Sequence, residues 1–253
     1  MMNRLMIQAG LLLVLAIPAK ADTIESIPAS LFIGPTQDKP GFPPPQSSFR
    51  PFDITTDLAF QGGPALAAVA KDVIPGHAAI HLAEFANDGS YGNGSSWIGN
   101  SPNSWLKVDL GQTTPIDSII FGRNRLEGGF YDREPGQFTV SVSLFDAVYA
   151  SGDDSNDADE YTQVFDSTLA GFIGFLSPQQ TLRAMFGAPV SARFVKMTFA
   201  NAGTAIDEVE IRAVPEPSSV ALLGMGGLAM LGCVIRRHRR VNQSLTRREG
   251  SCK

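Results

Sequence analysis

The chain has 253 residues, a formal net charge of −5, and 43% hydrophobic and 18% charged residues. These values suit one globular domain with appendages, and an acidic body argues against nucleic-acid binding, which needs Lys and Arg to neutralise phosphates. The only two cysteines, Cys233 and Cys252, lie near the C-terminus, so the central body has no disulfide framework.

The N-terminus has the parts of a secretory signal. Arg4 precedes an apolar run over residues 5–17, and the small-residue pattern Ala19-Lys20-Ala21 follows it. The run is shorter than the roughly 20 residues of a membrane-spanning helix. We therefore expect a signal helix over residues 1–21, which signal peptidase removes.

Residues 22–64 are rich in Pro, Ser and Gly, and the sequence Gly41-Phe42-Pro43-Pro44-Pro45 is incompatible with a helix or a central strand. This composition predicts an extended lead-in, with one edge strand near residues 52–60. Residues 65–86 have mixed apolar content split by Pro75-Gly76, which predicts a short helix on either side of the split.

Beyond Asn87 the hydrophobic pattern has a period of two, which predicts short strands. The alternation covers residues 105–110, 138–144, 161–165, 194–199 and 208–211, and residues 116–121 add a short apolar run. Several such strands between Gly, Pro, Asn and Asp loops indicate an all-β antiparallel sandwich. Because one face of each strand meets the other sheet, the alternate side chains, such as Lys107 and Glu210, are expected to face water. Trp105 is expected to pack in the core or at its rim.

The C-terminus carries three elements in order. Pro215, Glu216 and Pro217 come first, an apolar run over residues 219–235 follows, and Arg236-Arg237-His238-Arg239-Arg240 ends it. The run has about the minimum length of a transmembrane helix, and the arginines would hold its end in the cytoplasm.

This trio closely resembles the PEP-CTERM sorting signal of Gram-negative bacteria. The resemblance implies recognition by an exosortase, transient anchoring in the inner membrane, and delivery to the cell surface or extracellular matrix. Such tails usually stop just after the arginines, whereas here a polar, basic tail continues over residues 241–253. A plain C-terminal membrane anchor is the alternative.

The body resembles the discoidin, or factor 5/8 type C, domain. The resemblance rests on six segments in order: Asn87-Asp88-Gly89, Trp97, residues 105–111, residues 119–123, residues 138–143, and the pair of segments 193–197 and 206–211. It implies a galactose-binding-like jelly-roll β-sandwich over residues 65–213, between the lead-in and the sorting signal of residues 214–240. It also implies binding, of glycans in bacterial members and of anionic lipids or proteins in others, rather than catalysis.

In many members of that family an early Asp and a Glu near the last strand hold calcium. On this sequence those positions are Asp88 and Glu208, with Ser96 as a hydroxyl ligand and Asn93 as a further candidate. Independently, the loop 87–96 is rich in the oxygen-bearing side chains that Ca²⁺ prefers. The alternative is that Asp88 only closes an Asx-turn before Gly89.

Loops at one end of the resembled fold form its ligand site, which places Arg125, Tyr131 and Trp97 as ligand-binding candidates. For Trp97 a buried aromatic in the core is the competing interpretation. Arginines in the loop 123–133 can instead pair with nearby carboxylates.

Two further patterns are interpreted as structural. His77 and His81 have a helical spacing that can bind zinc, but no third ligand is evident, so we expect ordinary histidines. The acidic run over residues 153–160 departs from the EF-hand pattern and is expected to be a solvated loop.

The leading hypothesis is a non-catalytic surface or matrix protein that binds carbohydrate. No G-x-S-x-G motif, body cysteine or phosphate-binding loop is present. A purely structural matrix protein and a glycan-active enzyme remain as alternatives.

Overall fold

The structure, a computed structural model, describes residues 21–27, 33–36, 48–50, 56–73, 81–91, 96–122, 133–149, 153–172 and 181–214. The chain divides into two compact units, residues 1–213 and 214–253. The expected signal helix, the expected transmembrane helix and the basic tail lie outside the described residues. Within the described ranges, no helix is both long and apolar enough to cross a membrane.

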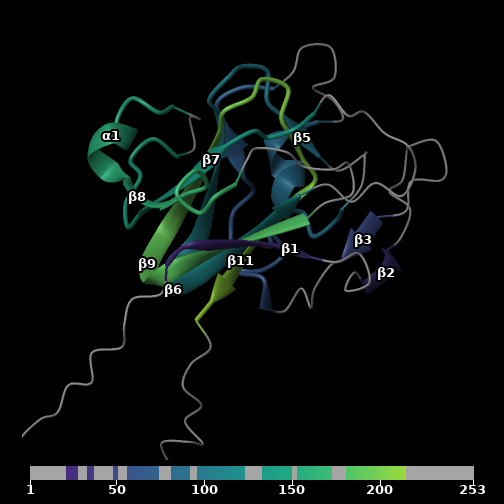
Figure 1. The fold of residues 1–253 in the computed structure, drawn as a ribbon, viewed down its shortest axis with the longest axis horizontal. Coiled ribbons are helices and arrows are strands. Elements are labelled where there is room, and N and C mark those ends of the chain that lie inside the picture. The colour runs from purple at the N-terminus through teal and green to yellow at the C-terminus, as the bar shows by residue number, and fades with distance from the viewer. Residues whose placement is uncertain are drawn as a thin grey trace, which may run out of the picture. The chain divides into compact units, whose positions relative to one another are not determined.

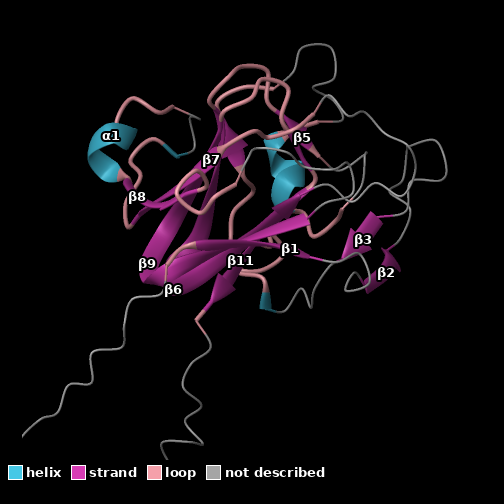
Figure 2. Ribbon diagram, viewed as in Figure 1, coloured by secondary structure: helices cyan, strands magenta, loops and turns pink. Residues whose placement is uncertain are grey.

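The described elements are mostly strands (Figure 2). They are β1 (Thr23–Ile27), β2 (Ile33–Thr36), β3 (Ser48–Arg50), β4 (Val69–Ala70), β5 (Trp97–Ile98), β6 (Ser104–Gly122), β7 (Phe138–Ser143), β8 (Thr162–Asp166), β9 (Thr181–Phe199), β10 (Ala205–Ile206) and β11 (Glu208–Ala213). Two short helices accompany them, the 3₁₀ helix η3 (Ala83–Asn87) and α1 (Asp157–Glu160). The expected all-β class is confirmed.

A long antiparallel ribbon of β6 and β9 forms the centre of the fold (Figure 1). The main sheet has the order β11-β6-β9-β7-β8, with β4 also pairing with β6 and β1 with β9. The pairs β10-β5 and β2-β3 form two smaller sheets. Every pairing in the described residues is antiparallel, as the alternating pattern predicts.

The ribbon folds back on itself and thereby makes the sandwich. Ser104 pairs with Phe199 at one end of the ribbon, and Phe121 pairs with Leu182 at the other. An extended strand between Ser104 and Phe121 would span roughly 55 Å. The rings of Phe121 and Phe199 are nevertheless only 5.8 Å apart. The two halves of the ribbon therefore face each other across the core.

Gly111 lies at the first irregularity of this ribbon, where the register shifts between Asp109 and Thr114. Its φ of +75° favours glycine, and a Cβ there would meet the carbonyl oxygen of Pro64 at 2.2 Å. The bend thus depends on a residue without a side chain.

An aromatic cluster fills the space between the two halves. The ring of Phe138 stacks on Phe165 at 5.6 Å and meets Phe121 edge-on at 4.8 Å, and Trp97 packs on Phe199 at 5.9 Å. Burial of these rings supplies much of the hydrophobic stabilisation. Trp105 is also buried, as expected.

The expectation that the alternate strand side chains face water is wrong at several positions. Lys107 is completely buried, and Glu208 and Glu210 are 1% and 4% exposed. Residues 144–149 and 153–161 contact the outward side of β6 at Lys107, and the segments 56–59 and 88–91 contact β11. An alternation with a period of two assigns side chains to the two faces of a strand, but it does not show which segments of the chain pack over each face.

The N-terminal part of the chain contributes to the main sheet. β1 pairs along β9, and an isolated bridge joins Asp57 to Arg212 of β11. Between residues 65 and 73 the structure has the short strand β4 in place of the expected helix, whereas η3 follows the Pro75-Gly76 split as expected.

Candidate functional site

The structure brings Asp88 and Glu208 together, although 120 residues separate them. Asp88 follows η3, and Glu208 begins β11. The Glu208 Oε2 accepts hydrogen bonds from the backbone N–H of Gly89 at 2.9 Å and of Ser90 at 3.0 Å. The loop after η3 therefore wraps around the Glu208 carboxylate.

The buried amide of Asn87 fixes the start of this loop. Its Nδ2 donates to the carbonyls of Ala59 and Leu66, and its Oδ1 accepts from the N–H of Ala68. Gly89 then turns the chain with a φ of +82°. One asparagine thus ties three segments together beside Glu208.

Glu208 belongs to a group of carboxyls with the buried Asp57 and Glu210 and the half-buried Asp88. Burial raises its pKa well above the usual range, and the negative charges of the other three raise it further. Burial likewise raises the pKa of Asp57 to about 6 and that of Glu210 to about 7, even though the Arg212 guanidinium lowers both. These raised pKa values mean that the group takes up protons more readily than free carboxyls, because burial disfavours its charged forms.

The other Glu208 oxygen, Oε1, is buried and has no hydrogen-bond partner among the described residues. Leaving a buried carboxylate oxygen without a donor is costly. The raised pKa of Glu208 favours a proton on this carboxyl, and a cation bound there would have to displace it.

Trp97 is in the core, and its ring offers no face to a ligand. The side chain is fully buried, and its indole Nε1 donates to the carbonyl of Asp72 at 2.9 Å. The Asp72 carboxylate in turn accepts from Ser101 Oγ at 2.5 Å and Ser104 Oγ at 2.7 Å. Of the two interpretations of Trp97, the buried aromatic is the one that the structure shows, which corrects its assignment to the ligand site.

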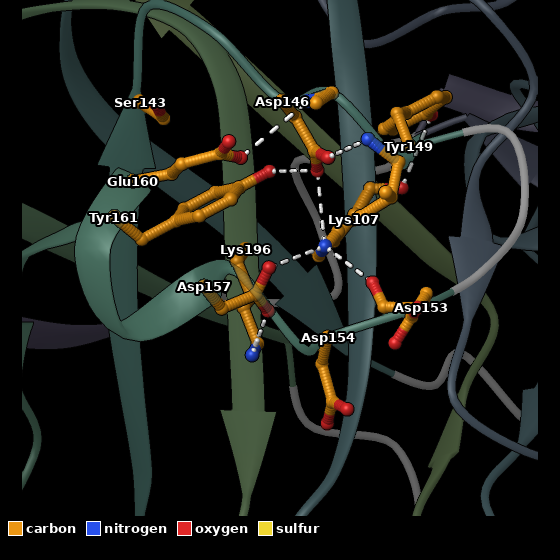
Figure 3. A network of polar contacts seen from close by, with 12 residues as sticks. Lys107, Ser143, Asp146, Tyr149, Asp153, Asp154, Asp157, Glu160, Tyr161 and Lys196 are labelled. Carbon is orange, nitrogen blue, oxygen red and sulfur yellow. Dashed lines mark hydrogen bonds and ion pairs between the residues drawn. The ribbon is translucent and has the colours of Figure 1, made fainter.

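A second buried polar group surrounds Lys107 of β6 (Figure 3). The Lys107 ammonium donates to Asp146 Oδ2 at 2.9 Å, to Asp157 Oδ1 at 2.6 Å and to the Asp153 carbonyl at 3.0 Å. Lys196, which pairs with Lys107 across β6 and β9, bonds the other oxygen of Asp157. The Tyr161 hydroxyl donates to Asp146 Oδ2 at 2.7 Å.

This Lys107 network attaches residues 144–149 and 153–161 to the sheet. The Trp105 Nε1 adds a bond to Asp154 Oδ2 at 2.9 Å, and the Lys107 ammonium lies 4.8 Å from the Trp105 ring centre. Two lysines face two buried aspartates, so the charge is balanced. For Asp157 the expected solvated loop is therefore wrong, while Asp153, Asp154 and Asp159 are exposed. Two lysines that lie opposite each other on neighbouring strands repel. The pairing of Lys107 with Lys196 therefore indicates that acidic side chains lie close to both.

A family model matches a large part of the chain. Residues 75–210 match the F5/8 type C domain, which is more than half of the chain. The chain belongs to the F5/8 type C domain family. Residues 213–240 match the PEP-CTERM protein-sorting motif. Both resemblances that the sequence indicated, to the F5/8 type C domain and to the PEP-CTERM sorting motif, are thereby confirmed.

Solved structures give distant similarities to this F5/8 type C domain. The family 32 carbohydrate-binding module of NanJ from Clostridium perfringens, in complex with galactose, is 18% identical with a TM-score of 0.43, over 62% of this chain and 97% of that one. Chitosan-binding module 2 of a chitosanase/glucanase from Paenibacillus sp. IK-5, in complex with chitotriose, is 19% identical with a TM-score of 0.42, over 62% and 100%. A search of curated proteins found no match.

The metal ligands predicted within the F5/8 type C domain do not all lie at one place in the structure. Asp88 and Glu208 are neighbours. Ser96 is buried with its Oγ 2.8 Å from His81 Nδ1, and this partner was not anticipated. Asn93 lies outside the described residues. Among the described residues, no group of three or more His, Cys, Asp or Glu side chains is placed to hold a metal ion.

The remaining predicted site residues lie outside the described part of the F5/8 type C protein. They are Arg125 and Tyr131 of the expected ligand loop, and Pro215, Glu216, Pro217, Arg236 and Arg237 of the sorting motif.

Proposed function

We propose that this protein is exported, delivered by its sorting motif to the cell envelope surface or the extracellular matrix, and binds carbohydrate there without catalysis. One observation carries the proposal: the F5/8 type C match ends at residue 210 and the PEP-CTERM match begins at residue 213. A binding domain is thus joined directly to a sorting signal. Signal peptidase and an exosortase are the processing partners, with residues 219–235 as a transient inner-membrane anchor.

The proposed ligand site is the loop 123–133, with Arg125 and Tyr131 as the contact residues. A guanidinium presents planar donors to sugar hydroxyls, and a tyrosine offers both a ring and a hydroxyl. Trp97 is excluded from this proposal, because its side chain is fully buried and its ring packs on Phe199 of β9.

We further propose a structural calcium ion at Asp88 and Glu208. The fit rests on the buried Glu208 oxygen without a donor and on the neighbouring carboxyl groups of Asp57, Asp88 and Glu210. Calcium bound there would neutralise the carboxylates and join the loop after η3 to the last strand. Asn93 and backbone carbonyls of the loop 88–96 are the candidates for the remaining oxygens.

A glycan array probed with the full-length protein tests the binding role. We expect a specific signal that Arg125→Ala and Tyr131→Ala abolish and that the control Arg183→Ala retains. Arg183 is a half-buried arginine on β9 with a weak surface pair to Glu25 at 3.5 Å. A blank array with a well-folded protein would instead support a structural matrix role.

Fractionation of the producing cells tests the sorting role. Deletion of residues 214–253 is expected to prevent retention at the cell surface, and replacement of Pro215, Glu216 and Pro217 by alanine should have the same effect. Unchanged surface delivery in both variants would contradict the proposal.

A further inference from the structure

The turn that follows β7 presents two apolar side chains to solvent. Leu144 is 59% exposed and Phe145 is 64% exposed. Among the side chains that the structure describes, Phe145 is the only aromatic one that is exposed. Exposed aromatic surface on a folded domain commonly marks a place of contact with another molecule.

The turn holds Phe145 outward by hydrogen bonds on both sides. The Ser143 Oγ accepts from the Phe145 N–H at 3.1 Å and donates to the Phe145 carbonyl at 2.6 Å. The next residue, Asp146, is anchored to Lys107 and Tyr161 in the Lys107 network. The backbone of Phe145 is therefore fixed before any ligand arrives, which reduces the entropy lost on binding.

A shallow hollow of about 350 Å³ lies beside this turn. Its lining consists of Val142, Ser143, Leu144, Phe145, Glu160, Thr162 and Ser191. The hollow combines the exposed ring with hydroxyl groups at its edge. Figure 3 shows Ser143 and Glu160 on the same side of the Lys107 network.

Glu160 is the one charged residue in this lining. Its Oε2 makes a long contact of 3.4 Å with the N–H of Ala147, so the carboxylate keeps capacity for stronger donors. The lysines nearby do not compensate its charge, because Lys107 and Lys196 are engaged by Asp146 and Asp157. The hollow therefore favours a cation.

We propose that this hollow is a second carbohydrate-binding site, which takes a cationic amino-sugar residue of a polysaccharide. The flat C–H face of the sugar would lie on Phe145, its ammonium would meet Glu160, and Thr162 and Ser191 would face its hydroxyls. An anionic membrane would be repelled by the same carboxylate. The site uses no residue of the loop 123–133, so it is independent of the proposed loop site.

Titration of the full-length protein with chitotriose and with its N-acetylated trimer tests this site. Phe145→Ala is expected to weaken chitotriose binding by about tenfold. Glu160→Gln should weaken binding of chitotriose and leave binding of the uncharged trimer unchanged. Added salt should likewise weaken binding of chitotriose but not of the uncharged trimer. Leu169→Ala is the matched control, because Leu169 is 83% exposed but does not line the hollow.

The outcomes separate this site from the proposed function. Chitotriose binding that Arg125→Ala abolishes and Phe145→Ala leaves unchanged would overturn the second site while supporting the loop site. Absence of chitotriose binding would also overturn it, whatever the glycan array shows. If Phe145→Ala instead lowers the sedimentation coefficient or the affinity for lipid vesicles, the surface serves self-association or membrane contact, and the proposal is rejected.

Discussion

The ammonium of Lys107 on β6 lies 2.6 Å from the Asp157 carboxylate on α1, and the two side chains are 0% and 9% exposed. The pair joins positions fifty residues apart in the sequence. It is the centre of the contacts that hold residues 144–149 and 153–161 against the ribbon.

Replacing Lys107 by methionine is expected to destabilise the protein strongly. The change leaves Asp146 and Asp157 buried with one remaining lysine, and breaking a buried pair in this way costs about 3–5 kcal/mol. Denaturant unfolding measures the loss. Lys71→Met is the control, because Lys71 and Asp154 form an exposed pair at 3.9 Å and its loss should cost less than about 1 kcal/mol. Equal effects of the two changes would contradict a central role for Lys107.

Acid is expected to weaken the same network. Burial acts to raise the pKa of Asp146, but hydrogen bonds from Tyr161 and Lys107 outweigh it and hold the pKa below its usual value. The stability that this group contributes is therefore present above the pKa of an unfolded aspartate and is lost as pH falls through the lower folded value. Unfolding free energies of the protein should fall more steeply below about pH 4 than those of Asp146→Asn. Parallel curves for the two proteins would exclude the contribution.

Calcium in excess is expected to raise the melting temperature. An ion that binds only the folded state stabilises it, by about 2.7 kcal/mol at a hundred times its dissociation constant. Glu208→Gln should abolish this rise, and without calcium it should not lower stability, because it removes a buried negative charge. Glu84→Gln, an exposed change on η3, should keep the response. No rise in the unmodified protein would refute the calcium site.

Gly111→Ala is expected to cost clearly more stability than Gly171→Ala. Both glycines have a φ near +75°, so alanine at either position loses about 1 kcal/mol of stability through its left-handed backbone conformation. At Gly111 the new Cβ would also clash with the Pro64 carbonyl, whereas nothing lies within 4 Å at Gly171. The difference between the melting temperatures of the two variants measures the destabilisation that the clash with Pro64 causes. Similar melting temperatures would show that the bend can relax.

Much of the fold class could be predicted because the alternation of apolar residues is a local property. The patterns at 105–110 and 116–121 were expected as separate strands, and the structure joins them in the single strand β6, bent at Gly111. The bend could not be predicted, because it depends on the close approach of Pro64, a long-range contact.

The candidate site was predictable only in part. Asp88 and Glu208 were paired through the family resemblance, and the structure places them together. Asp57 and Glu210 were missed, because each reads locally as a polar residue of a loop or a strand edge. Their burial appears only when the N-terminal segment bridges to β11.

The sequence by itself determined the all-β class, most of the strands beyond Asn87 and the sorting motif at residues 213–240, since each depends on residues that are close in the sequence. Only the tertiary structure decided which strand faces are covered. It buried Trp97 and Lys107 and left Phe145 exposed, because burial is set by what packs against a side chain, and those neighbours come from distant parts of the chain.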